Sequence, residues 1–330
     1  MRRSPARLAA ATAAVLMFLL GSAAAAPTEA PETGERTILL VTSKRSPTHH
    51  DYVNTFARKV RELSARQVEF RTYTPVELTG LISQSGRFPR SDLIVTVGTD
   101  AAVTVSGYSD DAPVFFTLIP QSSYYAIVDR FRQNFAPERE HSGLFLDHPV
   151  ERHLALVSAV LPPVRRVGVL LGSYTSHLRE RIREAATRMG LQVVFRSVEH
   201  EEQIYTSLQS LLPEVDVLVA LPDPAVYNRH TIRNMLITTF RYRKPLFGYS
   251  RALVKAGALA ALYSEPQAIG DEAARAVARS LAEASVDLPA PRHPSDFSVD
   301  VNFWVAESLD LDVPQVAKVL SRVREQVAPE

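Results

Sequence analysis

Short apolar runs alternate with helix-forming segments along this chain, and the alternation occurs twice. Apolar runs of the first series lie at 38–42, 68–73, 93–98 and 114–119. Those of the second series lie at 167–172, 191–196, 215–221, 245–248 and 259–263. Strands that alternate with helices indicate βαβ units around a parallel sheet, and buried parallel strands are continuous apolar runs. We therefore expect an α/β fold of two doubly wound parallel-sheet lobes with a cleft between them.

The length of the chain also indicates two lobes. A chain of 330 residues exceeds the usual size of one hydrophobic core. The helical stretch 150–160, followed by Pro162 and Pro163, marks the junction between the two series. We expect the first lobe to span 37–150 and the second lobe to span 151–284.

The C-terminal part departs from this alternation. Residues 285–330 contain a proline-rich extended segment, an alternating strand at 297–302 and two further helices. A strand and two helices that follow a complete second lobe are expected to return to the first lobe. The lobes would then be joined by more than one crossover, which makes a hinge.

The N-terminus has the three parts of a secretory signal peptide. Arginines precede an apolar run at 8–20, and small residues follow it. We expect residues 1–25 to be removed and the polar, proline-rich leader 26–36 to be disordered. The apolar run is too short for a good membrane span, although a retained anchor is the alternative. Since no other stretch reaches spanning length, we do not expect an integral membrane protein.

The chain contains no cysteine. Disulfides, thiol nucleophiles and cysteine-ligated zinc are therefore excluded, and so is a lipoprotein anchor, which needs a cysteine at the cleavage point. An exported protein without a lipid anchor needs a compartment that retains it, and a Gram-negative periplasm fits best. Loss of residues 1–25 removes three arginines and no acidic residue, so the formal net charge changes from +1 to −2. A nearly neutral chain argues against nucleic acid as a partner.

Four stretches carry a family resemblance. They are VTVGTDAA at 95–102, HPVERHLALVSAVLPPVRRVGVLLG at 148–172, KPLFGYSRALVKAGALAALYSEPQAIGDEAA at 244–274 and FSVDVNFWVAESLDLDVP at 297–314. In this order and spacing they resemble the ABC-type substrate-binding proteins of the tryptophan/tyrosine-binding type. The resemblance implies a type I periplasmic binding protein, which closes about a hinge on a small polar ligand and delivers it to an inner-membrane ABC permease. We expect a monomer without catalytic activity, cofactor or metal.

The segment 118–148 departs from that family. Its members often carry DPV…GLV and then PGGN and TG after the fourth strand, whereas only HSG at 141–143 keeps the end of this pattern here. The segment would border the cleft. The resemblance therefore implies the fold, but not a specificity for aromatic amino acids.

Polar and aromatic residues follow the expected strand ends. In open α/β sheets, ligands bind just beyond the carboxyl ends of the strands. Residues at these ends are therefore the expected ligand contacts. In the first lobe they are Ser43, Ser46, Thr99, Asp100, Thr117 and Gln121, and in the second lobe Ser173, Tyr174, Asp223, Tyr227, Tyr249 and Ser250.

Three of these residues also have a structural interpretation. Thr99 begins a helix, where its hydroxyl and the free amides of the first turn could hold an anion, or where it is a plain N-cap. Asp223 would bind an ammonium or hydroxyl group, or would start an ordinary Asp-Pro turn. Tyr249 would stack on a ring of the ligand or pack against its own lobe.

The histidines do not form a catalytic or metal-binding motif. His49 and His50 are adjacent, so on a helix they point about 100° apart and cannot easily share one ion. We interpret them as polar residues of a helix start. His141, His148 and His153 occur without an HExxH motif, and we interpret them as surface or hinge residues.

Two other functions stay open beside solute capture. The same fold would serve a periplasmic ligand sensor or an accessory of a receptor system, in which case no permease gene need lie nearby. An exported hydrolase is the third possibility, but GSYTS at 172–176 is not the GxSxG turn of a serine hydrolase. The sequence also lacks the glycine-rich loops of dinucleotide and phosphoryl chemistry.

Overall fold

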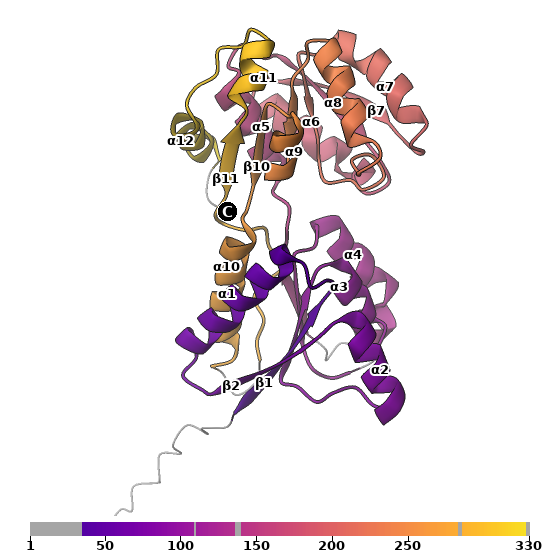
Figure 1. The fold of residues 1–330 in the computed structure, drawn as a ribbon, viewed down its shortest axis with the longest axis vertical. Coiled ribbons are helices and arrows are strands. Elements are labelled where there is room, and N and C mark those ends of the chain that lie inside the picture. The colour runs from indigo at the N-terminus through magenta and orange to yellow at the C-terminus, as the bar shows by residue number, and fades with distance from the viewer. Residues whose placement is uncertain (1–34, 109, 136–139, 283–285, 328–330) are drawn as a thin grey trace, which may run out of the picture. The chain divides into compact units, whose positions relative to one another are not determined.

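The computed structural model describes residues 35–108, 110–135, 140–282 and 286–327 (Figure 1). They belong to one compact unit, Gly34–Glu330. The expected signal peptide at 1–25 and nearly all of the expected leader at 26–36 lie outside the described residues. Within the described ranges, no helix is both long and apolar enough to cross a membrane.

The first lobe contains a parallel sheet of the order β2-β1-β3-β4-β5. All residues of β3 and β4 and the last five of β1 are buried, as expected when helices cover both faces of a parallel sheet. The strands are β1 (Arg36–Thr42), β2 (Val68–Tyr73), β3 (Leu93–Val97), β4 (Val114–Thr117) and β5 (His141–Leu144). The helices are α1 (Pro47–Leu63), α2 (Pro75–Ser85), α3 (Thr99–Ser106) and α4 (Gln121–Arg130).

The helix starts of this lobe follow from local sequence. Ser46 is the N-cap of α1 and Thr74 the N-cap of α2, and a proline follows each. The Thr74 hydroxyl accepts from the backbone N–H of Glu77, and the Glu77 carboxylate accepts from the N–H of Thr74 at 2.8 Å. This reciprocal pair is a capping box. Both helices therefore begin at the carboxyl ends of the strands that precede them.

The second lobe repeats the first with one added strand. Its order is β11-β10-β9-β8-β6-β7, in which β11 alone pairs antiparallel. The strands are β6 (Arg166–Leu171), β7 (Gln192–Ser197), β8 (Val217–Val219), β9 (Leu246–Gly248), β10 (Ala260–Tyr263) and β11 (Ser298–Val301). Its helices are α5 (Val150–Val160), α6 (Arg179–Arg188), α7 (Gln203–Leu211), α8 (Ile232–Arg241), α9 (Arg251–Ala256), α11 (Phe303–Ser308) and α12 (Val316–Gln326). Helix α10 (Pro266–Ser280) follows β10 in sequence. The expected fold class is confirmed.

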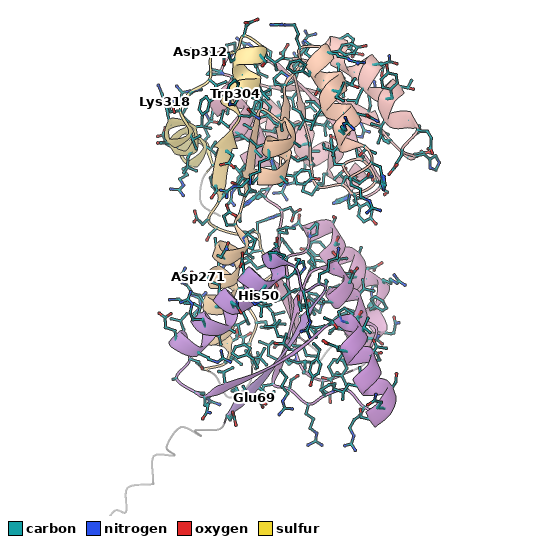
Figure 2. The ribbon with its side chains drawn as sticks, viewed as in Figure 1. His50, Glu69, Asp271, Trp304, Asp312 and Lys318 are labelled. Carbon is teal, nitrogen blue, oxygen red and sulfur yellow. The ribbon has the colours of Figure 1, made fainter. Side chains whose placement is uncertain are left out.

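Helix α10 packs in the first lobe, beside α1 (Figure 1). Ile269, Ala273 and Val277 join the core that contains Tyr52 and Phe56 of α1. Asp271 of α10 and His50 of α1 are labelled in that lobe in Figure 2. In sequence, the helix directly follows strand β10 of the second sheet. The alternation of strands and helices therefore predicts α10 in the second lobe, whereas it packs in the first.

The expectation that residues 285–330 return to the first lobe is wrong. Strand β11 pairs with β10, with Ala261 opposite Asp300, and α12 packs on α5 through Val319 and Val323. Trp304 and Lys318 accordingly lie in the second lobe in Figure 2. An alternating pattern shows that one face of a strand is buried, but it does not show which sheet edge the strand joins.

Within the described residues, three segments of the chain pass between the lobes, at 145–149, 264–265 and 286–297. Hydrogen bonds join them to one another: the Phe145 N–H donates to the Arg292 carbonyl at 2.9 Å, and the Arg292 N–H donates to the Gly143 carbonyl at 3.0 Å. The Arg292 guanidinium also pairs with the buried carboxylate of Glu272 on α10. The lobes are thus joined by more than one crossover, although not through the return of 285–330 to the first lobe from which this was expected.

Candidate ligand-binding site

A cavity of about 310 Å³ lies beside the crossovers and is lined from both lobes. This volume is at the lower end of the range of small-molecule sites, roughly 300–1,000 Å³. From the first lobe come Thr48 and Pro120 together with Pro266 at the start of α10, and from the second lobe His153, Pro222, Tyr249, Ser250, Arg251, Ala252, Leu262 and Tyr263. Leu146, Asp147, His148, Ser264 and Glu265 of the crossovers complete the wall.

A narrower space of about 30 Å³ adjoins the cavity, because Asp147, His148 and Pro222 line both. It has room for a water molecule, which needs roughly 10–15 Å³ on the same scale. Its other walls are the start of α4 and the turn between β6 and α6, with His293 from the third crossover.

Four of the twelve expected contacts line these spaces. Gln121 and Tyr174 line the narrow space, and Tyr249 and Ser250 line the cavity. Ser250 is at the same time the N-cap of α9, since its hydroxyl accepts from the Leu253 N–H at 3.3 Å. The other expected contacts have different surroundings.

Asp223 holds its own lobe together. Its side chain is 1% exposed, and one carboxylate oxygen accepts from the Gly172 N–H at 3.1 Å and from the Thr175 hydroxyl at 2.7 Å. The other oxygen accepts from the Ala225 N–H at 3.0 Å. A Cβ at Gly172 would lie 2.7 Å from the carboxylate, so glycine is required for this approach. The turn interpretation of Asp223 agrees with these contacts.

Two further expected contacts are also in the core. The Thr117 hydroxyl, fully buried, donates to the Thr96 carbonyl at 2.8 Å. Tyr227 is buried against the edge of Tyr249, with the ring centroids 6.3 Å apart. Burial raises the pKa of the Tyr227 phenol. Tyr227 thus supports Tyr249 from behind, and Tyr249 itself both packs on its lobe and lines the cavity.

The remaining expected contacts of the first lobe serve strand-to-helix turns or lie in solvent. The Ser43 hydroxyl accepts from the Ala101 N–H at 2.9 Å, and Ser46 caps α1. Thr99 and Asp100 are exposed in the first turn of α3. The N-cap is Gly98, with φ of 89° and Ser43 Oγ only 2.7 Å from where its Cβ would be, so the N-cap interpretation of Thr99 is wrong by one residue.

Ser173 is the last expected contact. It is exposed in the turn that follows β6, directly before Tyr174. Its side chain lines neither the cavity nor the narrow space.

Sequence reasoning missed the buried histidines as wall residues. His148 and His153 are 6% and 2% exposed and both line the cavity. The signal was present in α5: Val150, Leu154 and Val157 form one apolar face, and position 153 lies beside it at helical spacing. The expectation of a hinge position fits both residues, whereas a surface position fits neither.

His148 connects two of the crossovers. The Ser264 hydroxyl donates its proton to the Asp296 carbonyl at 2.5 Å, so it accepts from His148 Nε2 at 3.1 Å. His148 Nδ1 then accepts from the Arg152 guanidinium at 3.0 Å. Burial, followed by the charges of His153 and Arg152, holds the pKa of His148 far below its ordinary value. The ring is neutral, as this tautomer requires.

Burial also shifts the pKa values of the other titratable groups of the wall toward the neutral form. It lowers the pKa of His153 to about 4 and raises the pKa of Tyr249 and of Tyr263 to about 12. It also raises the pKa of Asp147, against the opposing effect of His293. These four groups and His148 therefore all favour their neutral forms more than they would in water.

The arrangement supports binding through apolar contact and hydrogen bonds. Tyr249 and Tyr263 present aromatic surface, and leucine and proline side chains supply the rest of the apolar wall. Over the described part of the chain, no group of three or more His, Cys, Asp or Glu side chains is arranged to hold a metal ion.

Comparisons with known proteins agree with this fold. The family model described as ABC transporter substrate binding protein matches residues 82–325. No curated protein matches the sequence. Among solved structures, a conserved domain protein from Vibrio cholerae is similar at 22% identity, with 87% of this chain and 98% of that chain covered and a TM-score of 0.61.

Two further structures are similar at lower identity. One is an ABC domain in complex with L-Trp from Streptococcus pneumonia, at 18% identity, with 88% of this chain and 98% of that chain covered and a TM-score of 0.61. The other is the ligand-free, open form of a substrate binding protein with adhesive properties from Clostridium difficile. That match has 16% identity, covers 85% of this chain and 96% of that chain, and has a TM-score of 0.65.

Proposed function

Because the chain belongs to the ABC transporter substrate binding protein family, we propose that it captures a small ligand in the cavity beside the crossovers and delivers it to an ABC permease. The observation that carries this proposal is that both lobes contribute to the wall of one cavity of ligand size. A ligand there contacts both lobes at once. It therefore binds most tightly to the arrangement in which both sets of contacts are made, and shifts the population toward it.

The crossovers suit a hinge. Backbone hydrogen bonds join two of the crossovers, and the Ser264 hydroxyl joins the third to both of them, which suits a rotation of the lobes about the crossovers. The cavity lies against these segments, so Ser264, Glu265 and Pro266 form part of the ligand's surroundings and of the hinge at once. Binding and rotation are thereby coupled through the same residues.

The proposed location is the periplasm, with residues 1–25 removed as a signal peptide and no lipid anchor, since the chain has no cysteine. The proposed working form is a monomer that presents both lobes to an inner-membrane permease. The proposed direct contacts are Tyr249 and Ser250 of the second lobe and Gln121 and Tyr174 at the narrow space.

The experiment is a thermal-shift screen of the purified mature chain against amino acids, nucleosides, sugars, polyamines and small anions. A ligand present at one hundred times its dissociation constant adds about 2.7 kcal/mol to the free energy of unfolding. We expect at least one class to raise the melting temperature. If every class leaves it unchanged, the capture proposal is contradicted.

Tyr249→Ala tests the place of binding. We expect this variant to lower the affinity for the ligand found by the screen about tenfold, because it removes an aromatic wall of the cavity. The control is Tyr205→Ala, which removes a tyrosine of α7 that is 55% exposed and remote from the cavity. Uptake of the same ligand by cells that lack the protein separates transport from sensing: transport requires that wild-type protein restores uptake and Tyr249→Ala does not.

A further inference from the structure

The charged side chains that line the cavity and the narrow space are balanced. They are two arginines, Arg181 and Arg251, and two carboxylates, Asp147 and Glu265. Equal numbers of each sign leave the wall with no formal charge.

Each of these charges already has a partner in the protein. The Arg251 guanidinium pairs with Glu265 at 2.7 Å and with Asp300 at 3.1 Å. The Arg181 guanidinium pairs with Glu151 at 3.3 Å. The Asp147 carboxylate accepts from the Gln121 N–H at 2.9 Å and lies 3.9 Å from His293 Nδ1. A charged ligand would have to displace one of these partners or stay without an opposite charge of its own, whereas an uncharged ligand leaves all of them in place.

The wall of the cavity is mostly apolar. Leu146, Leu262, Pro120, Pro222 and Pro266 line it together with the two tyrosine rings. Such a wall suits a flat ring of modest size, since the volume is about 310 Å³.

Among the described residues, one buried polar atom of the cavity wall has no hydrogen-bond partner. The imidazole of His153 is 2% exposed, and its Nε2 finds no hydrogen-bond partner among the residues that the structure describes. Buried polar groups without a partner are rare in native proteins and call for an explanation. The neighbouring polar groups are already engaged, because the Ser264 hydroxyl bonds to the Asp296 carbonyl and to His148.

We propose that the cavity takes an uncharged ligand with an apolar ring, and that the imidazole of His153 supplies a hydrogen bond to the polar edge of that ring. This inference rests on the proposed function and names the chemical class of its ligand. The neutral imidazole carries one N–H and one lone pair, so it serves a donor or an acceptor of the ligand. The apolar wall and the tyrosines hold the ring itself.

The experiment compares ligands that share one ring and differ in charge. Indole is uncharged, tryptamine is a cation, indole-3-acetate is an anion and L-tryptophan is a zwitterion; benzamide, phenethylamine, phenylacetate and L-phenylalanine form a second series. Affinities for the purified mature chain are measured by calorimetry at neutral pH. In at least one series, we expect the uncharged member to bind at least about tenfold more tightly than its three charged relatives.

Variants then test the imidazole. We expect His153→Leu, which fills a similar volume, to lower the affinity for the uncharged ligand about five- to tenfold. His153→Gln keeps a donor and an acceptor, so it should retain most of the wild-type affinity. His200→Leu, at an exposed histidine in the turn before α7, is the control and leaves affinity unchanged. Circular dichroism and melting curves confirm that each variant is folded.

Each outcome decides between the two proposals. If a zwitterion, cation or anion binds more tightly than the uncharged ring, the ligand class is wrong while solute capture stands. If His153→Leu binds the uncharged ring as tightly as wild type, the histidine makes no ligand contact. If no member of either series and no ligand of the broader screen binds, both this inference and the proposed function fail.

Discussion

The residues that follow the strands have one role at the centre of each sheet and another role beside the crossovers. At the point where strand order reverses, between β1 and β3 and between β6 and β8, polar side chains hold the protein's own turns. Ser43 accepts from Ala101, and Asp223 accepts from Gly172. Beside the crossovers, the segments after β4, β5, β9 and β10 supply most of the wall of the cavity.

This difference teaches that a polar residue at a strand end is not by itself a ligand contact. The rule that open α/β sheets bind ligands beyond their strand ends locates the correct edge of both sheets. Whether a given side chain faces the cavity depends on its backbone neighbours. Free N–H groups of a following turn attract short carboxylates and hydroxyls such as those of Asp223 and Ser43, whereas longer aromatic side chains reach past the turn.

Asp223→Ala gives the largest expected effect. It leaves the buried Gly172 N–H and Thr175 hydroxyl without their acceptor, so we expect the free energy of unfolding to fall by about 3–4 kcal/mol, measured by urea denaturation. The matched control is Asp100→Ala, which removes an exposed carboxylate from the corresponding turn of the first lobe and should change stability by less than about 0.5 kcal/mol. Equal effects would remove the distinction between structural and exposed strand-end acids.

His153, which is buried in α5, gives a pH dependence. Burial lowers the folded-state pKa of His153 to about 4, below the ordinary value of about 6.5 that it has in the unfolded chain. Its contribution is fully present above pH 6.5 and is lost as the pH falls toward 4, because only the unfolded state then takes up the proton. We expect a loss of about 3 kcal/mol over this range.

Urea denaturation at a series of pH values measures this dependence. In His153→Leu, the loss of stability between pH 6.5 and pH 4 should be smaller by about the same amount. His200→Leu, at an exposed histidine, should keep the wild-type profile. A wild-type slope in His153→Leu would show that other groups cause the acid sensitivity.

Gly270→Val tests the packing of α10 in the first lobe. A Cβ at Gly270 would lie 3.0 Å from the Tyr52 carbonyl of α1, so a branched side chain must push the helices apart, at an expected cost of about 2 kcal/mol. At Gly80, in α2, nothing lies within 4 Å of a Cβ, and Gly80→Ala should instead stabilise by about 0.5–1 kcal/mol. Thermal denaturation of the two variants should therefore give shifts of opposite sign.

Ser250→Ala gives the smallest expected effect and tests a residue with both roles. Loss of the N-cap hydroxyl of α9 should lower stability by about 1 kcal/mol. Because Ser250 also lines the cavity, the same variant should weaken ligand binding. Ser46→Ala removes the N-cap hydroxyl of α1 outside the wall, so it should lower stability without a change in affinity.

The sequence predicted the sheets well and the surroundings of individual side chains less well. Continuous apolar runs such as Leu93–Val97 predict a strand that is covered on both faces, as in a parallel sheet. Strand β5, His141–Leu144, has no such run and was not predicted. The partner of α10 could not be read from the sequence either, since its apolar face fits any helix of matching shape.

The same limit applies to the cavity. Tyr249 and Ser250 were found because they follow a clear strand. His148 and His153 are separated from Ser264 by more than 100 residues along the chain, and only the fold brings them to one wall. Their polarity suggested surface or hinge positions, but the apolar face of α5 carries His153 inside.

The place of α10 also has a consequence for biosynthesis. The core of the first lobe contains Ile269, Ala273 and Val277, so it stays incomplete until about four fifths of the chain has been made. Contacts this distant in sequence form slowly. A chain that emerges from the ribosome thus lacks the packing of α10 on α1 for most of its synthesis.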